Sequence, residues 1–214
     1  MSPAPDEREA PRALIALDVA TTVGWSALNP GERPIWGHRR MGSPNAELGE
    51  VLNFFSVWLG ATLDRLRPKH VVIESPYVPM GQRDPVRINT ATLPFNFAPG
   101  RPTRGGAPMN MATVWRLCAM TGHVYQACYE RGIDCRDVPT QVWSKFFTGR
   151  GGGFGGRQKK KAAAVATAAL YGWVATEDEA DSLGLLLYSE HLLYPKIAQM
   201  RRPIGSLRLT SGAG

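Results

Sequence analysis

Four acidic residues have the types and positions that suit metal chemistry. Asp18 ends the apolar run ALIALD, and Glu74 ends a second such run, HVVIE. Asp178 and Asp181 are three residues apart, which places them on one face of a helix. Carboxylate oxygens are the ligands that Mg²⁺ prefers, and a pair of divalent ions needs several of them to offset its charge. If the fold brings these residues together, they predict a divalent-metal site.

The two apolar runs indicate how Asp18 and Glu74 meet. Each run is typical of a short strand buried on both faces, because it leaves no polar side for solvent. A helix between them would act as a right-handed crossover and lay the two strands parallel. Neighbouring strands lie roughly 4.8 Å apart, and open α/β sheets place their sites at the carboxyl edge. Asp18 and Glu74 are therefore expected to share that edge.

Each carboxylate taken alone also has an ordinary structural explanation. Asp18 can be a turn or capping residue, and Glu74 can simply end a strand. Asp178 can interact with a helix dipole, which is the commoner use of an acidic residue in a first turn. The order strand–Asp, strand–Glu, helix–DxxD favours a joint site over these separate roles.

The first part of the chain should form a strand meander and the crossover helix. GWSAL and PIWGHRRM follow the first strand and indicate an antiparallel meander, entered through a tight turn at Thr21, Thr22 and Gly24. The helix is expected to begin with Ser43 as N-cap and Pro44 at its first position. The strand that ends in Glu74 follows it.

The second half should supply one more strand and the helix that carries Asp178 and Asp181. The elements expected there are a helix over 110–131, a strand over 133–138, a short helix in PTQVWSKFF capped by Thr140, a glycine-rich loop over 149–156, and an alanine-rich helix to about 173. Thr176 and Glu179 form a capping box for the last helix. Glu179 thereby has a structural role, and the two aspartates are free to face the sheet.

The chain should form one domain with two tails. Its 214 residues are enough for one core. We expect a disordered tail over 1–12, a folded domain over 13–194 and a basic C-terminal tail over 195–214. The segment 75–108 is rich in Pro, Gly and Arg and is long for a connection, so it is either functional or disordered. Core positions are expected for Trp25, Trp36, Trp58 and Trp115, because aromatic rings supply large buried area.

The charge of the chain points to a polyanionic partner. The net charge is +7, and basic residues cluster at Arg157, Lys159, Lys160 and Lys161. The three cysteines lack zinc-site spacing, which favours reduced thiols and a cytoplasmic location. No apolar stretch approaches the length of a membrane span, and residues 1–12 lack a signal-peptide core.

The motifs in their order, ALDVATTVGW, VVIESPY, VPTQVWSKFFTGRG, KKKAAAV and EDEADSLGLLLY, resemble the RuvC family of Holliday junction resolvases, within the ribonuclease H-like superfamily. The resemblance spans about residues 13–188. It implies an α/β, ribonuclease H-like nuclease domain with a five-stranded mixed sheet, made of a three-stranded antiparallel meander and parallel strands, flanked by helices. It also implies a homodimer that cuts four-way DNA junctions, with Asp18, Glu74, Asp178 and Asp181 holding two Mg²⁺ or Mn²⁺ ions.

The resemblance implies roles for further residues. Tyr77 stands where the family keeps an aromatic residue that enters the junction. Lys145 and one of Lys159, Lys160 and Lys161 match the basic residues that contact the scissile phosphate or the DNA backbone. From composition alone, Arg157 and four arginines of the long segment can follow phosphates, although a plain surface role is as good an explanation for each of the four: Arg83, Arg87, Arg101 and Arg104.

Three departures from the family leave junction selectivity and any branch-migration partner open. They are the length of 78–108, the glycine content of 149–156 and the basic C-terminal tail. A phage or otherwise diverged resolvase, or a ribonuclease H-like nuclease of broader specificity, fits them. An actin- or heat-shock-type ATPase also opens with strand–Asp–turn–Gly, but the chain is short for that duplicated fold. A non-catalytic relative would have lost carboxylates, and a proofreading exonuclease usually carries Asp-x-Glu on its first strand.

Overall fold

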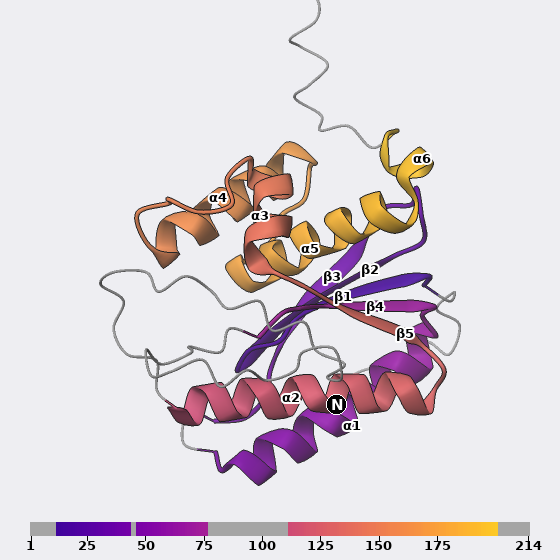
Figure 1. The fold of residues 1–214 in the computed structure, drawn as a ribbon, viewed down its shortest axis with the longest axis vertical. Coiled ribbons are helices and arrows are strands. Elements are labelled where there is room, and N and C mark those ends of the chain that lie inside the picture. The colour runs from indigo at the N-terminus through magenta and orange to yellow at the C-terminus, as the bar shows by residue number, and fades with distance from the viewer. Residues whose placement is uncertain (1–11, 44–45, 77–110, 201–214) are drawn as a thin grey trace, which may run out of the picture.

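The computed structural model describes residues 12–43, 46–76 and 111–200. A five-stranded sheet lies between two layers of helices, with α1 and α2 on one face and α3, α4 and α5 on the other (Figure 1). In chain order the elements are β1 (Leu14–Asp18), β2 (Thr22–Leu28), β3 (Ile35–Arg40), α1 (Leu48–Leu66), β4 (His70–Glu74), α2 (Met111–Glu130), β5 (Asp134–Val138), α3 (Thr140–Thr148), α4 (Arg157–Leu170), α5 (Glu177–Leu193) and α6 (Pro195–Ala198).

The sheet has the mixed topology expected from the sequence. Its strand order is β3-β2-β1-β4-β5. The first three strands form an antiparallel meander, and β4 and β5 join parallel to β1. Leu17 pairs with Ile73, so the next residues along the two strands, Asp18 and Glu74, end neighbouring strands at one edge. The predicted meeting of these strand ends is thus present.

Both faces of the central strand are buried, as its unbroken apolar sequence predicts. Ile15 and Leu17 pack into the core beneath α1 and α2, whereas Leu14 and Ala16 pack against the layer that contains α5. Side chains alternate across a strand, so a strand covered on both faces has no position for a polar residue until it ends. Asp18 follows where this double cover stops.

The beginning of α1 differs from the prediction. The helix starts at Leu48 with Glu47 as N-cap, rather than with Ser43 as the cap. The Ala46 amide donates a hydrogen bond to the Ser43 carbonyl, and Ala46 is buried. Burial of Ala46 ahead of the helix is a tertiary contact that a local capping pattern does not reveal. Pro44 lies outside the described residues.

One tryptophan assigned to the core is on the surface. Trp115 of α2 is 66% exposed, whereas Val114, Val124 and Cys128 are buried. Consecutive helical residues point about 100° apart, so a helix that buries position 114 turns position 115 towards the rim. Trp25, Trp36 and Trp58 are partly buried against the two cores.

The helix α5 is the central element of its layer. Every residue from Ala180 to Leu187 is buried, because the helix contacts the sheet as well as α3 and α4. The predicted capping box opens it: the Thr176 amide donates to the Glu179 carboxylate over 2.7 Å. Within the described residues, no helix has both the length and the apolar character needed to cross a bilayer.

Candidate active site

The four acidic residues come together at the carboxyl edge of the sheet. Asp18 and Glu74 end β1 and β4, and Asp178 and Asp181 lie in the first two turns of α5. The pKa of Asp18 is raised well above its usual range, first by burial and then by the negative charges of Glu74, Asp181 and Asp178. Since each of those carboxylates acts on Asp18, the four groups share one electrostatic environment.

Asp181 is the most informative member of this group. It is only 4% exposed, and burial raises its pKa to about 6 against the lowering influence of Lys160. Its Oδ1 atom is buried without a hydrogen-bond partner. Buried polar atoms are almost always paired, so an orphaned carboxylate oxygen needs an explanation such as an ion. A hard divalent cation fits this set of oxygen donors.

Glu74 is held by a residue to which the sequence assigned another role. The Thr140 hydroxyl donates a hydrogen bond to Glu74 Oε1. Thr140 was predicted to cap α3, but Pro139 is the N-cap and Thr140 is the first helical residue. The pairing of β5 beside β4, with Val138 opposite Glu74, delivers Thr140 to the carboxylate. Its place two residues after a parallel neighbour strand is the signal that could have revealed it.

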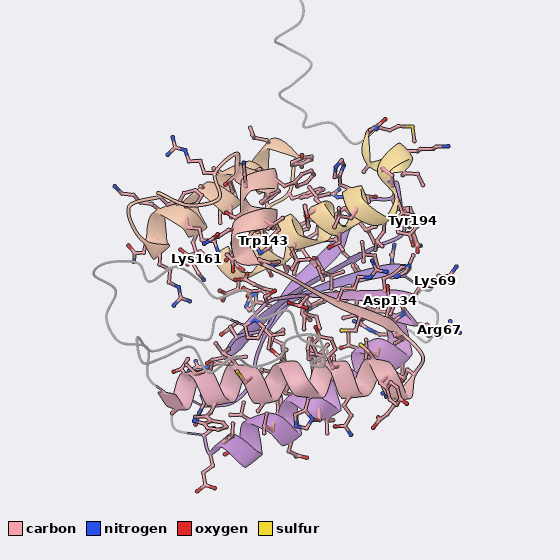
Figure 2. All side chains as sticks on the ribbon, in the orientation of Figure 1. Arg67, Lys69, Asp134, Trp143, Lys161 and Tyr194 are labelled. Carbon is pink, nitrogen blue, oxygen red and sulfur yellow. The ribbon has the colours of Figure 1, made fainter. Side chains whose placement is uncertain are left out.

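Two lysines of α4 contact the aspartates of α5. Lys161 Nζ lies 2.5 Å from Asp178 Oδ1 and 3.5 Å from Glu177 Oε2. Lys160 Nζ lies 3.7 Å from Asp181 Oδ2 and 4.8 Å from the ring centre of Trp143. Figure 2 shows Lys161 beside Trp143, on the opposite side of the view from Lys69 and Asp134, which mark the amino ends of β4 and β5.

The carboxylates do not lie in a ligating arrangement around one point. Across the described parts of the chain, no three His, Cys, Asp or Glu side chains lie close enough to hold one ion. The negative charges of Glu74, Asp181 and Asp178 nevertheless each raise the pKa of Asp18, so these groups lie near it. Two of the four carboxylates are instead paired with ammonium groups of α4, Asp178 with Lys161 and Asp181 with Lys160.

The other predicted site residues lie apart from this cluster or outside the described residues. Lys145 is exposed in the last turn of α3, and Arg157 and Lys159 are exposed in the first turn of α4. Outside the described residues are Tyr77, Arg83, Arg87, Arg101 and Arg104.

Gly24 allows α5 to approach the sheet. It lies in β2 opposite Asp18, inside the strand rather than in the predicted turn. A Cβ atom at position 24 would overlap the carbonyl oxygen of Asp178. Glycine inside a strand often marks such a close backbone approach. Gly24 therefore sets how near the first turn of α5 comes to Asp18.

Glu179 faces away from the acidic cluster towards the edge strand. Besides completing the capping box, its carboxylate lies 2.9 Å from His38 Nδ1 of β3. Its pKa is lowered, because hydrogen bonds from Thr176 and His38 outweigh the opposing effect of burial. The helix thus uses Glu179 for its own start, as the sequence predicted, whereas Asp178 and Asp181 pair with Lys161 and Lys160 of α4.

The strand order and the two helical layers define a ribonuclease H-like fold. The structure is similar to that of Thermus thermophilus RuvC in complex with a Holliday junction substrate, with 13% identity and a TM-score of 0.54 over 86% of this chain and 95% of that one. A second T. thermophilus RuvC structure matches with 14% identity and a TM-score of 0.50, over 88% and 99% of the two chains. No protein-family model and no curated protein matches the sequence. The resemblance to RuvC is therefore confirmed as a likeness of fold.

Proposed function

We propose that this protein is a metal-dependent endonuclease that cleaves four-way or related branched DNA by two-metal hydrolysis of phosphodiester bonds. The observation that carries the proposal is the grouping of the half-buried Asp18 with Glu74, Asp178 and the buried Asp181 at the carboxyl edge of a RuvC-like fold. Four acidic groups in one partly dry region repel one another, and this arrangement is costly unless cations offset it.

Asp18, Glu74, Asp178 and Asp181 would hold the ions. Bound Mg²⁺ or Mn²⁺ supplies Lewis-acid polarisation of the phosphate and lowers the pKa of an attacking water. The protein contributes the orientation of its oxygens: Thr140 fixes one oxygen of Glu74, and the capping box fixes the turn that carries Asp178. Burial of Asp181 keeps bulk water from screening the charges.

Branched DNA is the proposed substrate. One structural neighbour is RuvC in complex with a Holliday junction, and the net charge of +7 suits a polyanion. We assign backbone contacts to Lys145, Arg157, Lys159, Lys160 and Lys161, and to Arg83 and Arg87 of the long segment. Tyr77 is the proposed aromatic wedge at the junction. A homodimer would present two such sites to a symmetric junction, in DNA recombination and repair.

The test is a cleavage assay with purified protein on labelled four-way junction, three-way junction, flap and linear duplex DNA. We expect junction cleavage that requires Mg²⁺ or Mn²⁺ and is lost on chelation. Equal cutting of junction and linear duplex would indicate a ribonuclease H-like nuclease of broader specificity instead of a resolvase. Absence of cleavage on every substrate would remove the nuclease function.

A further inference from the structure

The first turns of α4 bring positive charge into the acidic cluster. The side chains of Lys160 and Lys161 are 22% and 12% exposed, so their ion pairs with Asp181 and Asp178 are partly shielded from solvent. Lys160 also lies over the ring of Trp143, which is fully buried. These contacts distinguish the two residues from ordinary surface lysines.

The ammonium groups offset the acidic charge only in part. Asp181 Oδ2 faces Lys160, but Asp181 Oδ1 is buried and has no hydrogen-bond partner. Asp18 sits among the same carboxylates, and Lys160 opposes their effect on its pKa. The site therefore has acceptor capacity that the lysines do not use.

A divalent ion bound to Asp178 would compete directly with Lys161. With Nζ at 2.5 Å from Oδ1, the ammonium occupies one of the acceptor positions of that oxygen. Two cations near one oxygen repel each other, and more strongly where water is partly excluded. A lysine ammonium can move away from the carboxylate without movement of its helix, because a flexible four-carbon chain connects it to the backbone.

We propose that Lys160 and Lys161 are exchangeable counter-ions of this site, which a divalent cation displaces from Asp181 and Asp178. The inference deepens the proposed function and rests on it. The released ammonium groups become available to DNA phosphates. Metal loading and DNA contact are then linked through the same two side chains, whereas Lys159, exposed and near Gly155, takes no part in the exchange.

The first experiment measures Mn²⁺ affinity by calorimetry or electron paramagnetic resonance on the full chain without DNA. Lys160→Met and Lys161→Met should each bind Mn²⁺ at least about fivefold more tightly than the wild type, the lower range of typical coupling between sites. Lys159→Met removes the same charge from the same helix. Its Mn²⁺ affinity should stay within about twofold, because exposed charges are screened. Unchanged or weaker affinity in both Lys160→Met and Lys161→Met would overturn the proposal.

The second experiment uses the wild-type protein and does not depend on the folding of variants. An amine-reactive label is applied with and without Mn²⁺, and modified lysines are located by mass spectrometry. Mn²⁺ should increase labelling of Lys160 and Lys161 relative to Lys159. Equal labelling in both conditions would contradict the exchange.

The two proposals fail in distinguishable ways. Junction cleavage together with metal-independent labelling would refute the exchange and leave the nuclease. Metal-dependent labelling without cleavage of any DNA would refute the nuclease and leave the exchange as a property of the metal site.

Discussion

Asp18 lies near three carboxylates that raise its pKa and near the ammonium group of Lys160, which lowers it. At the scale of single residues, this crowding has two opposite consequences. Loss of one carboxylate weakens the binding of metal cations. It also reduces the repulsion that the site exerts on the phosphates of DNA. Cleavage and binding should therefore respond in opposite directions to the same substitution.

Neutral variants of the four acidic residues test this expectation. Asp18→Asn, Glu74→Gln, Asp178→Asn and Asp181→Asn should each abolish junction cleavage while DNA binding stays equal or becomes tighter, as measured by cleavage and gel-shift titrations. Glu179→Gln is the control on the same helix. It should cleave and lose at most about 1 kcal/mol of unfolding free energy, because Gln can still close the capping box and only the negative charge at the helix start is removed. An essential Glu179 beside a dispensable Asp178 would show that the helix faces the sheet differently.

The hydroxyl of Thr140 should matter more for activity than for stability. Thr140→Val preserves the shape of the side chain but removes the donor to Glu74. Residues that orient metal ligands typically cost about 10–100-fold in metal affinity or activity when they are replaced. We expect a loss in that range in both Mn²⁺ affinity and cleavage rate. Thr140→Ser keeps the donor and should recover most of the loss; failure of this recovery would point to packing instead.

Tyr77 separates a resolvase from a general nuclease, although it lies outside the described residues. If its ring stacks on bases opened at the crossover, it contributes roughly 1–3 kcal/mol per base. Tyr77→Ala should then reduce junction cleavage strongly with little change in melting temperature, and Tyr77→Phe should retain most activity. A large fall in melting temperature for Tyr77→Ala would identify a core residue.

At the scale of elements, the position of α5 depends on its contact with β2. Asp178 reaches the acidic cluster because the first turn of α5 lies directly on Gly24, where a Cβ atom would overlap the Asp178 carbonyl. The contact involves backbone on both sides, so no rotamer change can relieve it. The helix itself is fixed at its other contacts by buried residues such as Leu183 and Leu186.

Gly24→Ala should therefore destabilise the fold and impair cleavage. Overpacking of this kind typically costs about 1–3 kcal/mol, measured by urea denaturation. Gly122→Ala in α2 is the matched control, because nothing lies within 4 Å of its added Cβ atom. There, alanine should stabilise the protein by up to about 1 kcal/mol through helix propensity. Equal stability of Gly24→Ala and wild type would mean that α5 shifts freely.

At the scale of the whole molecule, an acidic group of residues and a basic group of residues lie next to each other. The carboxylates occupy the strand ends, and the basic residues of α4 begin directly beside them. A polyanion such as DNA could therefore contact the basic residues of α4 next to the carboxylates that would hold cations. The net charge of +7 adds a general attraction.

DNA affinity should consequently fall steeply with salt. Each phosphate contact on duplex DNA adds about 0.9 to the slope of log affinity against log salt. Replacement of Lys159, Lys160 and Lys161 together by Met should flatten the slope by up to about 2.7 in the presence of a divalent ion, three contacts at that increment. An unchanged slope would show that these lysines make no phosphate contacts.

The features that the sequence predicted well are those that depend on neighbouring residues. Uninterrupted apolar runs require strands covered on both faces, which gave β1 and β4, and the Thr176–Glu179 spacing closes the cap of α5 without help from other elements. The convergence of Asp18 and Glu74 also followed from sequence, because a right-handed crossover leaves few ways to pair two buried strands.

Other features arise only when distant segments pack. The predicted start of α1 and the predicted core position of Trp115 were wrong, because packing against other elements overrides local patterns. The Thr140–Glu74 hydrogen bond joins residues 66 positions apart, and the Lys161–Asp178 contact joins two helices. The number of residues between two distant segments does not predict how far apart the segments lie in space. The sequence therefore predicted the residue types at the candidate site. Only the tertiary structure determined which groups hold those residues in place.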